Sequence, residues 1–440
     1  MRASTRNLLR LLAILLAFSL VAAACGGDDD DEPAAQEPAD EPAEEPAEEP
    51  AEEPAEEPAE EPAEEPAEEP AEEMAPARIG LIAQDEELLA FPEVRAASQA
   101  FVDYFNAELD GADGSPIELE ICGAGDAPEG HVACAQEFAN ADDINLVISA
   151  GFLANSAAAN DVLVGEGVPV LTLGNDFIDY LTPGVYTVDP GLPGLAQVFF
   201  VFAAGEGVTS GTLFIADDPA FEPFIPALQA IAGANGITLE EVVPLGFEPD
   251  LTGPISAADP ANEMWLFVLA DGAQCTAAAS GVDTVGYEGR TFANDLCLSE
   301  DVVSSGVVDG WAGPIVSSAP TVDGGDDVAL INRVLDEYGS ADAQNAGLSG
   351  WALASTWVAR DVLIAAGGAD ATRESVAAAL GSYASSDVPG LDSVSCPGPS
   401  AWTGACNMAP LMVTVTDGQL TSPDGFVQLD FSELDFLLEG

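Results

Sequence analysis

The sequence predicts an α/β protein whose body consists of two doubly wound lobes, each a parallel sheet with helices on both faces. Two observations predict this fold class. Short apolar runs alternate with helical stretches from about residue 78 onward, and the alternation starts a second time after Pro190. Strands separated by helices at this spacing indicate βαβ units and therefore parallel strands. Of the 440 residues, roughly 360 follow Ala77, enough for two lobes with buried cores.

The first series alternates strictly between the two element types. Apolar runs predict strands at residues 79–83, 117–122, 146–150 and 168–173. Helical patterns predict helices at residues 93–109, 130–140 and 156–164.

The second series follows the same rule. Helices are predicted at residues 195–204 and 221–235, and strands at residues 211–215, 238–243 and 265–269. In such sheets ligands collect at the carboxyl ends of the strands, where helix N-termini point their positive dipoles. We therefore look for a binding site at those ends.

Residues 1–24 are predicted to be a signal peptide. Arg2, Arg6 and Arg10 precede an apolar run that is short for a bilayer span and ends in small residues. The stretch from Val21 to Gly27 resembles a bacterial lipobox. That resemblance implies a lipidated Cys25 that holds the protein at the outer face of the bacterial cell membrane. The alternative is an ordinary signal peptide, with Cys25 as a spare thiol.

Residues 25–77 are predicted to be a disordered acidic linker. Pro-Ala-Glu-Glu units repeat from about residue 41 to residue 73. Proline and like charges oppose any compact state, so the segment is expected to be an extended tether that reaches roughly 100–150 Å. The alternative is a tail that binds calcium or a basic partner.

The charge of the chain excludes nucleic acid as a partner. The net charge is −69, and no lysine occurs. Beyond the signal peptide the only arginines are Arg78, Arg95, Arg290, Arg333, Arg360 and Arg373. Such a surface repels phosphate backbones.

Besides Cys25, six cysteines occur as three sequence-local couples. The couples are Cys122 with Cys134, Cys275 with Cys297, and Cys396 with Cys406. Disulfides persist outside the cytoplasm, so three bridges are predicted; six cysteines allow fifteen pairings, and proximity alone selects this one. No metal is expected, because His131 is the only histidine and no Cys-x-x-Cys occurs. His131 is expected at the surface, at the beginning of a helix.

The sequence lacks the constellations of an enzyme. It has no Gly-x-Ser-x-Gly, no phosphate-binding Gly-x-x-x-x-Gly-Lys and no dinucleotide fingerprint. One histidine leaves little room for a nucleophile–histidine couple. We expect a receptor without a cofactor.

Several stretches resemble one known family. Asp113–Leu119 and Glu166–Leu171 are similar to its early motifs, and Gly350–Gly368 and Arg373–Leu380 to its two C-terminal helices. The family is that of the type I solute-binding proteins of ABC transporters, specifically the branched-chain amino-acid (Leu/Ile/Val) group.

The resemblance implies a domain order and a function. Lobe 1 would comprise residues 78–192 and 321–384, and lobe 2 residues 193–320 and 385–440. A monomer would bind a small polar solute, an amino acid or a related amine or amide, and deliver it to a permease by closing its cleft. The alternative is a lipoprotein sensor or adhesion module with the same fold.

The resemblance also implies where the solute lies. The predicted ligand-binding residues are Asn155, Ser156, Gly174, Asn175, Asp176, Phe221, Asn294 and Asp295. Asn155 or Ser156 would open a helix whose amides hold a carboxylate, or would be a plain N-cap. Asp176 stands where the family often has Thr or Ser, which disfavours an α-amino-acid carboxylate there. Phe221 is either a ligand cover or core packing, and Asn294 and Asp295 either hold an amine or form a structural loop.

Overall fold

The computed structural model describes residues 74–85, 90–151, 154–174, 176–315, 322, 325–344, 348–399, 401–423 and 425–438. The predicted signal peptide, Cys25, the acidic linker up to residue 73 and Asn175 lie outside the described residues. No helix in these ranges is both long and apolar enough to cross a membrane.

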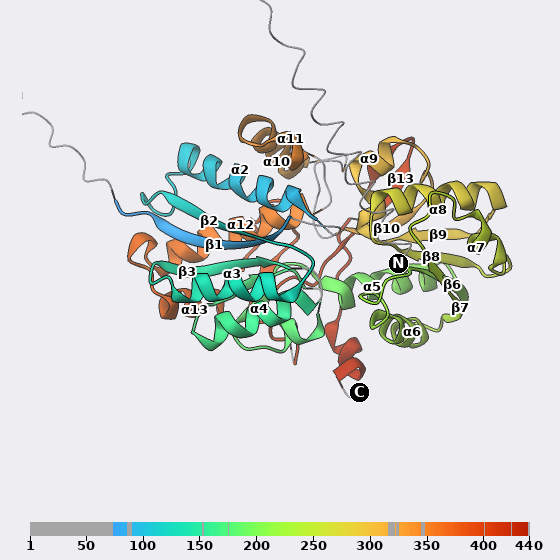
Figure 1. The fold of residues 1–440 in the computed structure, drawn as a ribbon, viewed down its shortest axis with the longest axis horizontal. Coiled ribbons are helices and arrows are strands. Elements are labelled where there is room, and N and C mark those ends of the chain that lie inside the picture. Colours follow the sequence, from blue (N-terminus) through green and yellow to red (C-terminus); the bar gives the residue numbers. More distant parts are fainter. Residues whose placement is uncertain are drawn as a thin grey trace, which may run out of the picture. The chain divides into compact units, whose positions relative to one another are not determined.

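The first sheet is parallel throughout, with the order β2-β1-β3-β4-β5. Figure 1 labels β2, β1 and β3 of this sheet. Its strands are β1 (Ala77–Gln84), β2 (Ile117–Ala124), β3 (Ile144–Ala150), β4 (Val170–Thr172) and β5 (Val185–Thr187). The helices that pack with it are α2 (Pro92–Glu108), α3 (Pro128–Asn140), α4 (Ala154–Gly165), α12 (Ser349–Ala366) and α13 (Arg373–Leu380).

Alternating side chains of β1 build a core on each face of this sheet. Ile79 and Leu81 belong to the core that includes residues of α2 and α12. Ile82 belongs to a separate core with Phe138 of α3 and Leu163 of α4. Because successive side chains of a strand point to opposite faces, a strand covered on both sides is apolar throughout.

The second sheet has the order β14-β13-β10-β9-β8-β6-β7. β6 (Ser210–Ala216), β7 (Thr238–Leu245), β8 (Met264–Val268), β9 (Arg290–Ala293) and β10 (Ala312–Ile315) pair in parallel. β13 (Leu411–Thr416) and β14 (Gln419–Thr421) add an antiparallel edge. The sheet is accompanied by α5 (Gly191–Gly205), α6 (Phe224–Ala234), α7 (Thr252–Ala257), α8 (Gly272–Val285) and α9 (Glu300–Ser304).

Two cores cover this sheet as well. Leu266 of β8 lies in the core that contains residues of α5 and α6. Its neighbours Trp265 and Phe267 lie in the opposite core with residues of α7 and α8. The predicted α/β fold with two parallel-sheet lobes is confirmed, with the antiparallel edge as an addition.

The remaining elements connect or cover the sheets. They are α10 (Gly325–Tyr338), α11 (Ala341–Gln344), β11 (Ala384–Ser385), β12 (Val394–Ser395) and four 3₁₀ helices, η1 (Phe177–Tyr180), η2 (Asp295–Leu298), η3 (Gly368–Asp370) and η4 (Phe431–Leu438).

The chain changes lobes at α5, between β10 and α10, and again before β13. Within residues 385–440, which the prediction assigns to lobe 2, the part before β13 packs against the first lobe. Val388, Cys396 and Cys406 pack in the first lobe's core, and Ala405 forms a parallel bridge with Thr187 of β5. Through this single bridge the segment covers part of the edge that β5 forms at the end of the sheet.

The three predicted disulfides are confirmed. Cys122–Cys134, Cys275–Cys297 and Cys396–Cys406 have Cα–Cα distances of 5.7, 5.2 and 4.6 Å. These distances are normal for such bridges. Each bridge closes a short loop within one lobe.

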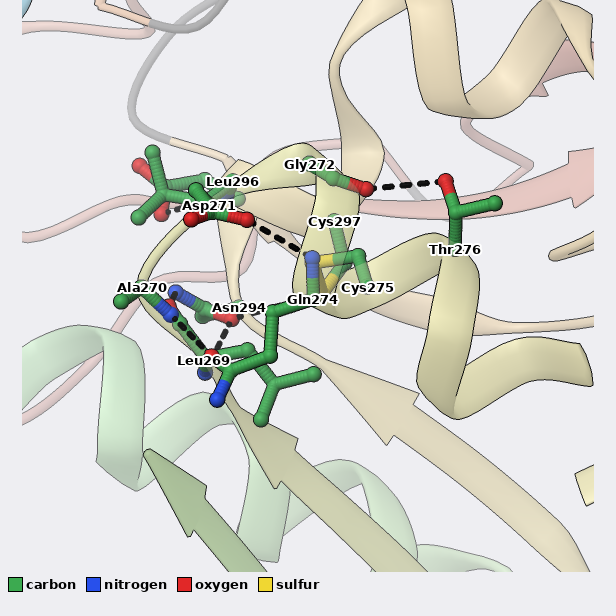
Figure 2. Close-up of a disulfide and its surroundings, with 11 residues drawn as sticks. Leu269, Ala270, Asp271, Gly272, Gln274, Cys275, Thr276, Asn294, Leu296 and Cys297 are labelled. Carbon is green, nitrogen blue, oxygen red and sulfur yellow. Dashed lines mark hydrogen bonds between the residues drawn. A yellow bond between two sulfur atoms is a disulfide. The ribbon is translucent and has the colours of Figure 1, made fainter. Parts of the chain in front are cut away.

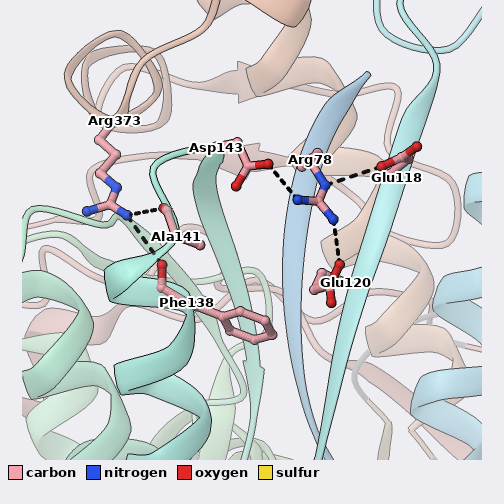
Figure 3. A network of polar contacts seen from close by, with 7 residues as sticks. All are labelled: Arg78, Glu118, Glu120, Phe138, Ala141, Asp143 and Arg373. Carbon is pink, nitrogen blue, oxygen red and sulfur yellow. Dashed lines mark hydrogen bonds and ion pairs between the residues drawn. The ribbon is translucent and has the colours of Figure 1, made fainter. Parts of the chain in front are cut away.

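Two arginines hold the first lobe together at the end opposite the carboxyl ends of its strands (Figure 3). Arg78 of β1 forms ion pairs with Glu118, Glu120 and Asp143 at 3.2, 2.6 and 2.5 Å. Arg373 of α13 donates only to backbone carbonyls, namely those of Phe138, Ala139, Ala141, Ile144 and Glu166. It thereby satisfies the last carbonyls of α3, which a helix end leaves without partners.

The expectation for His131 was wrong. Its side chain is fully buried in α3, with Nε2 3.0 Å from the carbonyl oxygen of Gly125. Burial lowers the pKa of this imidazole, so it is neutral near pH 7. The cause of the error is position: His131 lies in the first turn of α3, on the side that faces the sheet rather than the solvent.

Candidate functional site

A pocket receives residues from both lobes. Leu173 lies just after β4 and Asp189 just after β5, while Val268 ends β8 and Asn294 follows β9. The pocket thus lies beyond the carboxyl ends of strands in both sheets, where open α/β sheets bind ligands.

The wall of the pocket is mainly apolar. Five phenylalanines line it, Phe91, Phe177, Phe199, Phe221 and Phe224. Aliphatic side chains from α5, α6 and the strand ends fill the spaces between them. The polar side chains in the wall are Asp189, Asn294 and Asp295. Such a wall suits a small ligand with an apolar body and few polar groups.

The loop that contains Asn294 and Asp295 is fixed at three points. Figure 2 shows Asn294 beside Leu269 and the disulfide between Cys297 and Cys275. The Asn294 amide accepts from the Leu269 N–H at 3.1 Å and donates to the Leu269 carbonyl at 3.0 Å. Cys297, two residues beyond Asp295, is bound to Cys275 at the start of α8. The loops that follow the carboxyl ends of β8 and β9 are therefore held together as one unit.

The first turn of α8 extends this unit to β7. Gln274 accepts from the Ala270 N–H at 2.9 Å and donates to the carbonyls of Leu245 and Gly246 at 2.8 and 2.9 Å. Its own N–H donates to the Asp271 carboxylate at 2.7 Å, which caps the helix. This buried network orders the wall before any ligand arrives, because each of its amide groups already has partners.

Asp189 lies where the chain first passes from one lobe to the other. Its carboxylate accepts from the Gly174 N–H at 3.2 Å and the Gly191 N–H at 3.1 Å, and the side chain is 1% exposed. Burial raises the pKa of Asp189 to about 7. Gly191 has φ 55°, and a Cβ there would overlap the Tyr180 hydroxyl. Only glycine fits this crossing.

Asp295 has a related environment. It is half-buried, accepts from the Leu296 N–H at 3.0 Å, and burial raises its pKa to about 6. In the pocket wall, these two carboxyls cost free energy when ionised without a positive partner.

The predicted site residues fall into two groups. Phe221, Asn294 and Asp295 line the pocket. Gly174 donates its N–H to Asp189, which also lines it. Asn155 donates to the Gln84 side chain and to the Asp126 carbonyl, both at 3.2 Å.

Ser156 and Asp176 have structural contacts too. Ser156 donates to Asp179 at 3.2 Å and is fully buried. Asp176 accepts from the Ile178 N–H at 3.1 Å and caps η1. Asn175 lies outside the described residues. Neither Asn155, Ser156 nor Asp176 is part of the described pocket wall.

Sequence reasoning missed Asp189 and most of the aromatic wall. Phe199 and Phe224 belong to apolar helices and have the same local pattern as core residues. Asp189 had a detectable signal, because an acid followed by Pro190 and Gly191 at the end of a strand is typical of a turn at a sheet edge. Within the described ranges, no three His, Cys, Asp or Glu side chains are grouped to hold a metal ion.

Comparison with known proteins places this arrangement in a family. The family model described as "Periplasmic binding protein" matches residues 76–419. No curated protein matches the sequence.

Solved structures share the fold at low sequence identity. A solute-binding protein of an ABC transporter from R. palustris, in complex with 4-hydroxybenzoate, is 15% identical with a TM-score of 0.63, covering 80% of this chain and 96% of that one. A protein of the Pseudomonas fluorescens group described as an ABC transporter permease is 15% identical with a TM-score of 0.68, covering 83% and 95%.

A third structure is from Silicibacter pomeroyi and is provisionally described as a branched-chain amino acid ABC transporter. It is 17% identical with a TM-score of 0.64, covering 81% of this chain and 98% of that one. At these identities the likeness concerns the fold. The family model covers most of the chain and describes transport proteins that act outside the cytoplasm, not enzymes. The chain therefore belongs to the periplasmic binding proteins, the solute-binding components of ABC transporters, with the type I fold.

Proposed function

We propose that this chain is a monomeric, lipid-anchored receptor that delivers a small amine- or amide-bearing solute, such as an amino acid, to an ABC permease. The observation that carries the proposal is the pocket whose wall comes from both lobes. A ligand that contacts both lobes at once favours the arrangement in which they lie together, and this difference is what a permease can read.

The chemistry of the wall supports the amine or amide. Asp189 and Asp295 accept hydrogen bonds, and Asn294 already uses its amide on Leu269. A solute with donor groups satisfies these carboxyls, whereas a phosphate or dicarboxylate requires arginine or lysine clamps.

The anchor and lobe limits are part of the proposal. Lipid on Cys25 and the acidic segment up to residue 77 would tether the body to the membrane. Lobe 1 would comprise residues 78–192 and 321–384. Lobe 2 would comprise residues 193–320 and 385–440, with the part before β13 packed on lobe 1.

Ligand-induced thermal stabilisation tests the proposal. The full chain is screened against amino acids, amides, polyamines and short-chain acids. A compound present at roughly a hundred times its Kd adds about 2.7 kcal/mol to the free energy of unfolding. The variant Asp295→Asn should weaken the shift, while Asp309→Asn, an exposed acid of the same lobe, should not. If no compound stabilises the protein, the solute-receptor function is refuted.

Transport is tested separately with the permease in membranes. The liganded receptor should stimulate ATP hydrolysis more than the empty one. A ligand-binding protein that never stimulates a permease would instead be a lipoprotein sensor or adhesion module.

A further inference from the structure

The pocket combines an apolar wall with acidic groups and nothing basic. Phe177, Phe199, Phe221 and Phe224 offer ring faces, and Asp189 and Asp295 bring carboxyls from the two lobes. The charge that a ligand must carry follows from whether any cation of the protein reaches these carboxyls.

Every cationic side chain beyond the signal peptide is engaged elsewhere. The chain has no lysine, and its six later arginines and His131 all lie in the described ranges. Arg78, Arg95, Arg290 and Arg333 form ion pairs with Asp or Glu, Arg360 binds the Leu109 and Gly111 carbonyls and pairs with Asp361, and Arg373 binds five carbonyls.

None of these arginines is in the wall of the pocket. Arg95 lies four residues beyond Phe91, and its guanidinium is engaged by Asp85. His131 is fully buried in α3, with Nε2 at the Gly125 carbonyl. The protein therefore brings no cationic side chain to a ligand carboxylate or to its own two carboxyls.

The carboxyls are consequently poised for a cation from outside. Asp189 accepts two backbone N–H groups, and Asp295 accepts one. Burial raises the pKa of both above the ordinary value, because the ionised form lacks a counter-charge. A ligand ammonium supplies that charge, whereas a ligand carboxylate adds a third negative group to a low-dielectric site.

We infer that the pocket selects a monoamine cation on an apolar, ring-sized body, and that it rejects solutes whose only charged group is a carboxylate. The inference rests on the proposed function and narrows its solute class. It also separates this chain from the structurally similar protein that holds 4-hydroxybenzoate. A shared fold does not determine the charge of the ligand.

Four probes with one phenyl body test the inference by calorimetry on the full chain. They are 2-phenylethylamine, L-phenylalanine, 3-phenylpropanoate and 2-phenylethanol. The amine should bind most tightly, and the alcohol roughly tenfold to a hundredfold more weakly, as expected for the loss of a charged hydrogen bond. 3-Phenylpropanoate should not bind, and L-phenylalanine should bind more weakly than the amine, because its carboxylate adds a negative group to the site.

Variants identify the group that recognises the amine. Asp295→Asn should reduce the preference for the amine over the alcohol by roughly tenfold or more, and leave the alcohol affinity unchanged. Asp309→Asn, exposed on the same lobe, should change neither. If Asp295→Asn weakens amine and alcohol equally, Asp295 does not read the charge and the inference is wrong.

The other outcomes separate this inference from the function on which it rests. If 3-phenylpropanoate or L-phenylalanine binds as tightly as the amine, the amine assignment is wrong while the receptor function stands. The same holds if none of the four binds but the wider panel yields a ligand. If neither set binds, both fail.

Discussion

The stability of the protein should decrease as pH rises from about 5 to about 7, and Asp179 should be one cause. Asp179 lies in η1 and is 1% exposed. Its carboxyl accepts from Ser156 Oγ at 3.2 Å and from Asn160 Nδ2 at 2.9 Å. Burial, with a smaller contribution from the nearby charge of Asp176, raises the pKa of Asp179 from 3.8 to about 7.

The sign follows from proton linkage. Between these two pKa values the folded protein holds the proton and the unfolded chain has released it. The free energy of unfolding therefore falls as pH rises, and the stabilisation present at low pH is lost by about pH 7. The change from 3.8 to about 7 corresponds to roughly 4 kcal/mol in all, at about 1.4 kcal/mol per pKa unit.

The variant Asp179→Asn isolates this contribution. An asparagine keeps an oxygen for Asn160 and places an N–H toward Ser156 Oγ, so it resembles the protonated acid. Urea unfolding at pH values from about 5 to about 8 should show a pH slope up to roughly 1.4 kcal/mol per unit shallower in the variant. Asp142→Asn, exposed in the same lobe, serves as the control. Equal slopes in wild type and Asp179→Asn would refute the reasoning.

Three further predictions follow from the packing. Replacing both cysteines of Cys275–Cys297 with alanine should lower the free energy of unfolding by roughly 3 kcal/mol. It should also weaken ligand binding, measured by calorimetry, because the Asp295 loop loses its covalent link to α8. The same change at Cys122–Cys134 should affect stability alone. Arg373→Ala should lower the free energy of unfolding by roughly 2–4 kcal/mol, since several buried carbonyls lose a charged donor. An unchanged midpoint of urea unfolding would contradict this role of Arg373. Gly191→Ala should prevent folding, because the alanine Cβ would overlap Tyr180. Gly205→Ala, whose Cβ meets nothing within 4 Å, should fold normally, and circular dichroism distinguishes the two outcomes.

Strands buried on both faces were predictable from the sequence. β8 is apolar throughout, and β1 and β6 contain apolar runs at residues 79–83 and 213–216, because each strand contributes side chains to two cores. β9 and β10 have four residues each, which is too short for a clear pattern. In addition, β9 begins with Arg290 and β10 contains Pro314, and neither residue is typical of a buried strand. α8 is rich in small residues, which gives its apolar face little contrast.

The site was less predictable than the fold. The resemblance to a known family names Phe221, Asn294 and Asp295 as ligand-binding residues; they line the pocket, and their contact with a ligand stays a prediction. Asp189 was not, because its role depends on Gly174 and Gly191 meeting at the crossing between lobes. The pattern Asp189-Pro190-Gly191 indicates a turn, but no local pattern shows that residues which follow separate strands meet there.

The order of the disulfides along the chain bears on how the protein is made. Cys122–Cys134, Cys275–Cys297 and Cys396–Cys406 join consecutive cysteines, with separations of 12, 22 and 10 residues. A chain that emerges on the oxidising side of a membrane from its N-terminus exposes each couple in full before the next begins. If Cys25 carries lipid as proposed, an oxidant that joins the remaining cysteines in order of appearance reaches the native set without reshuffling.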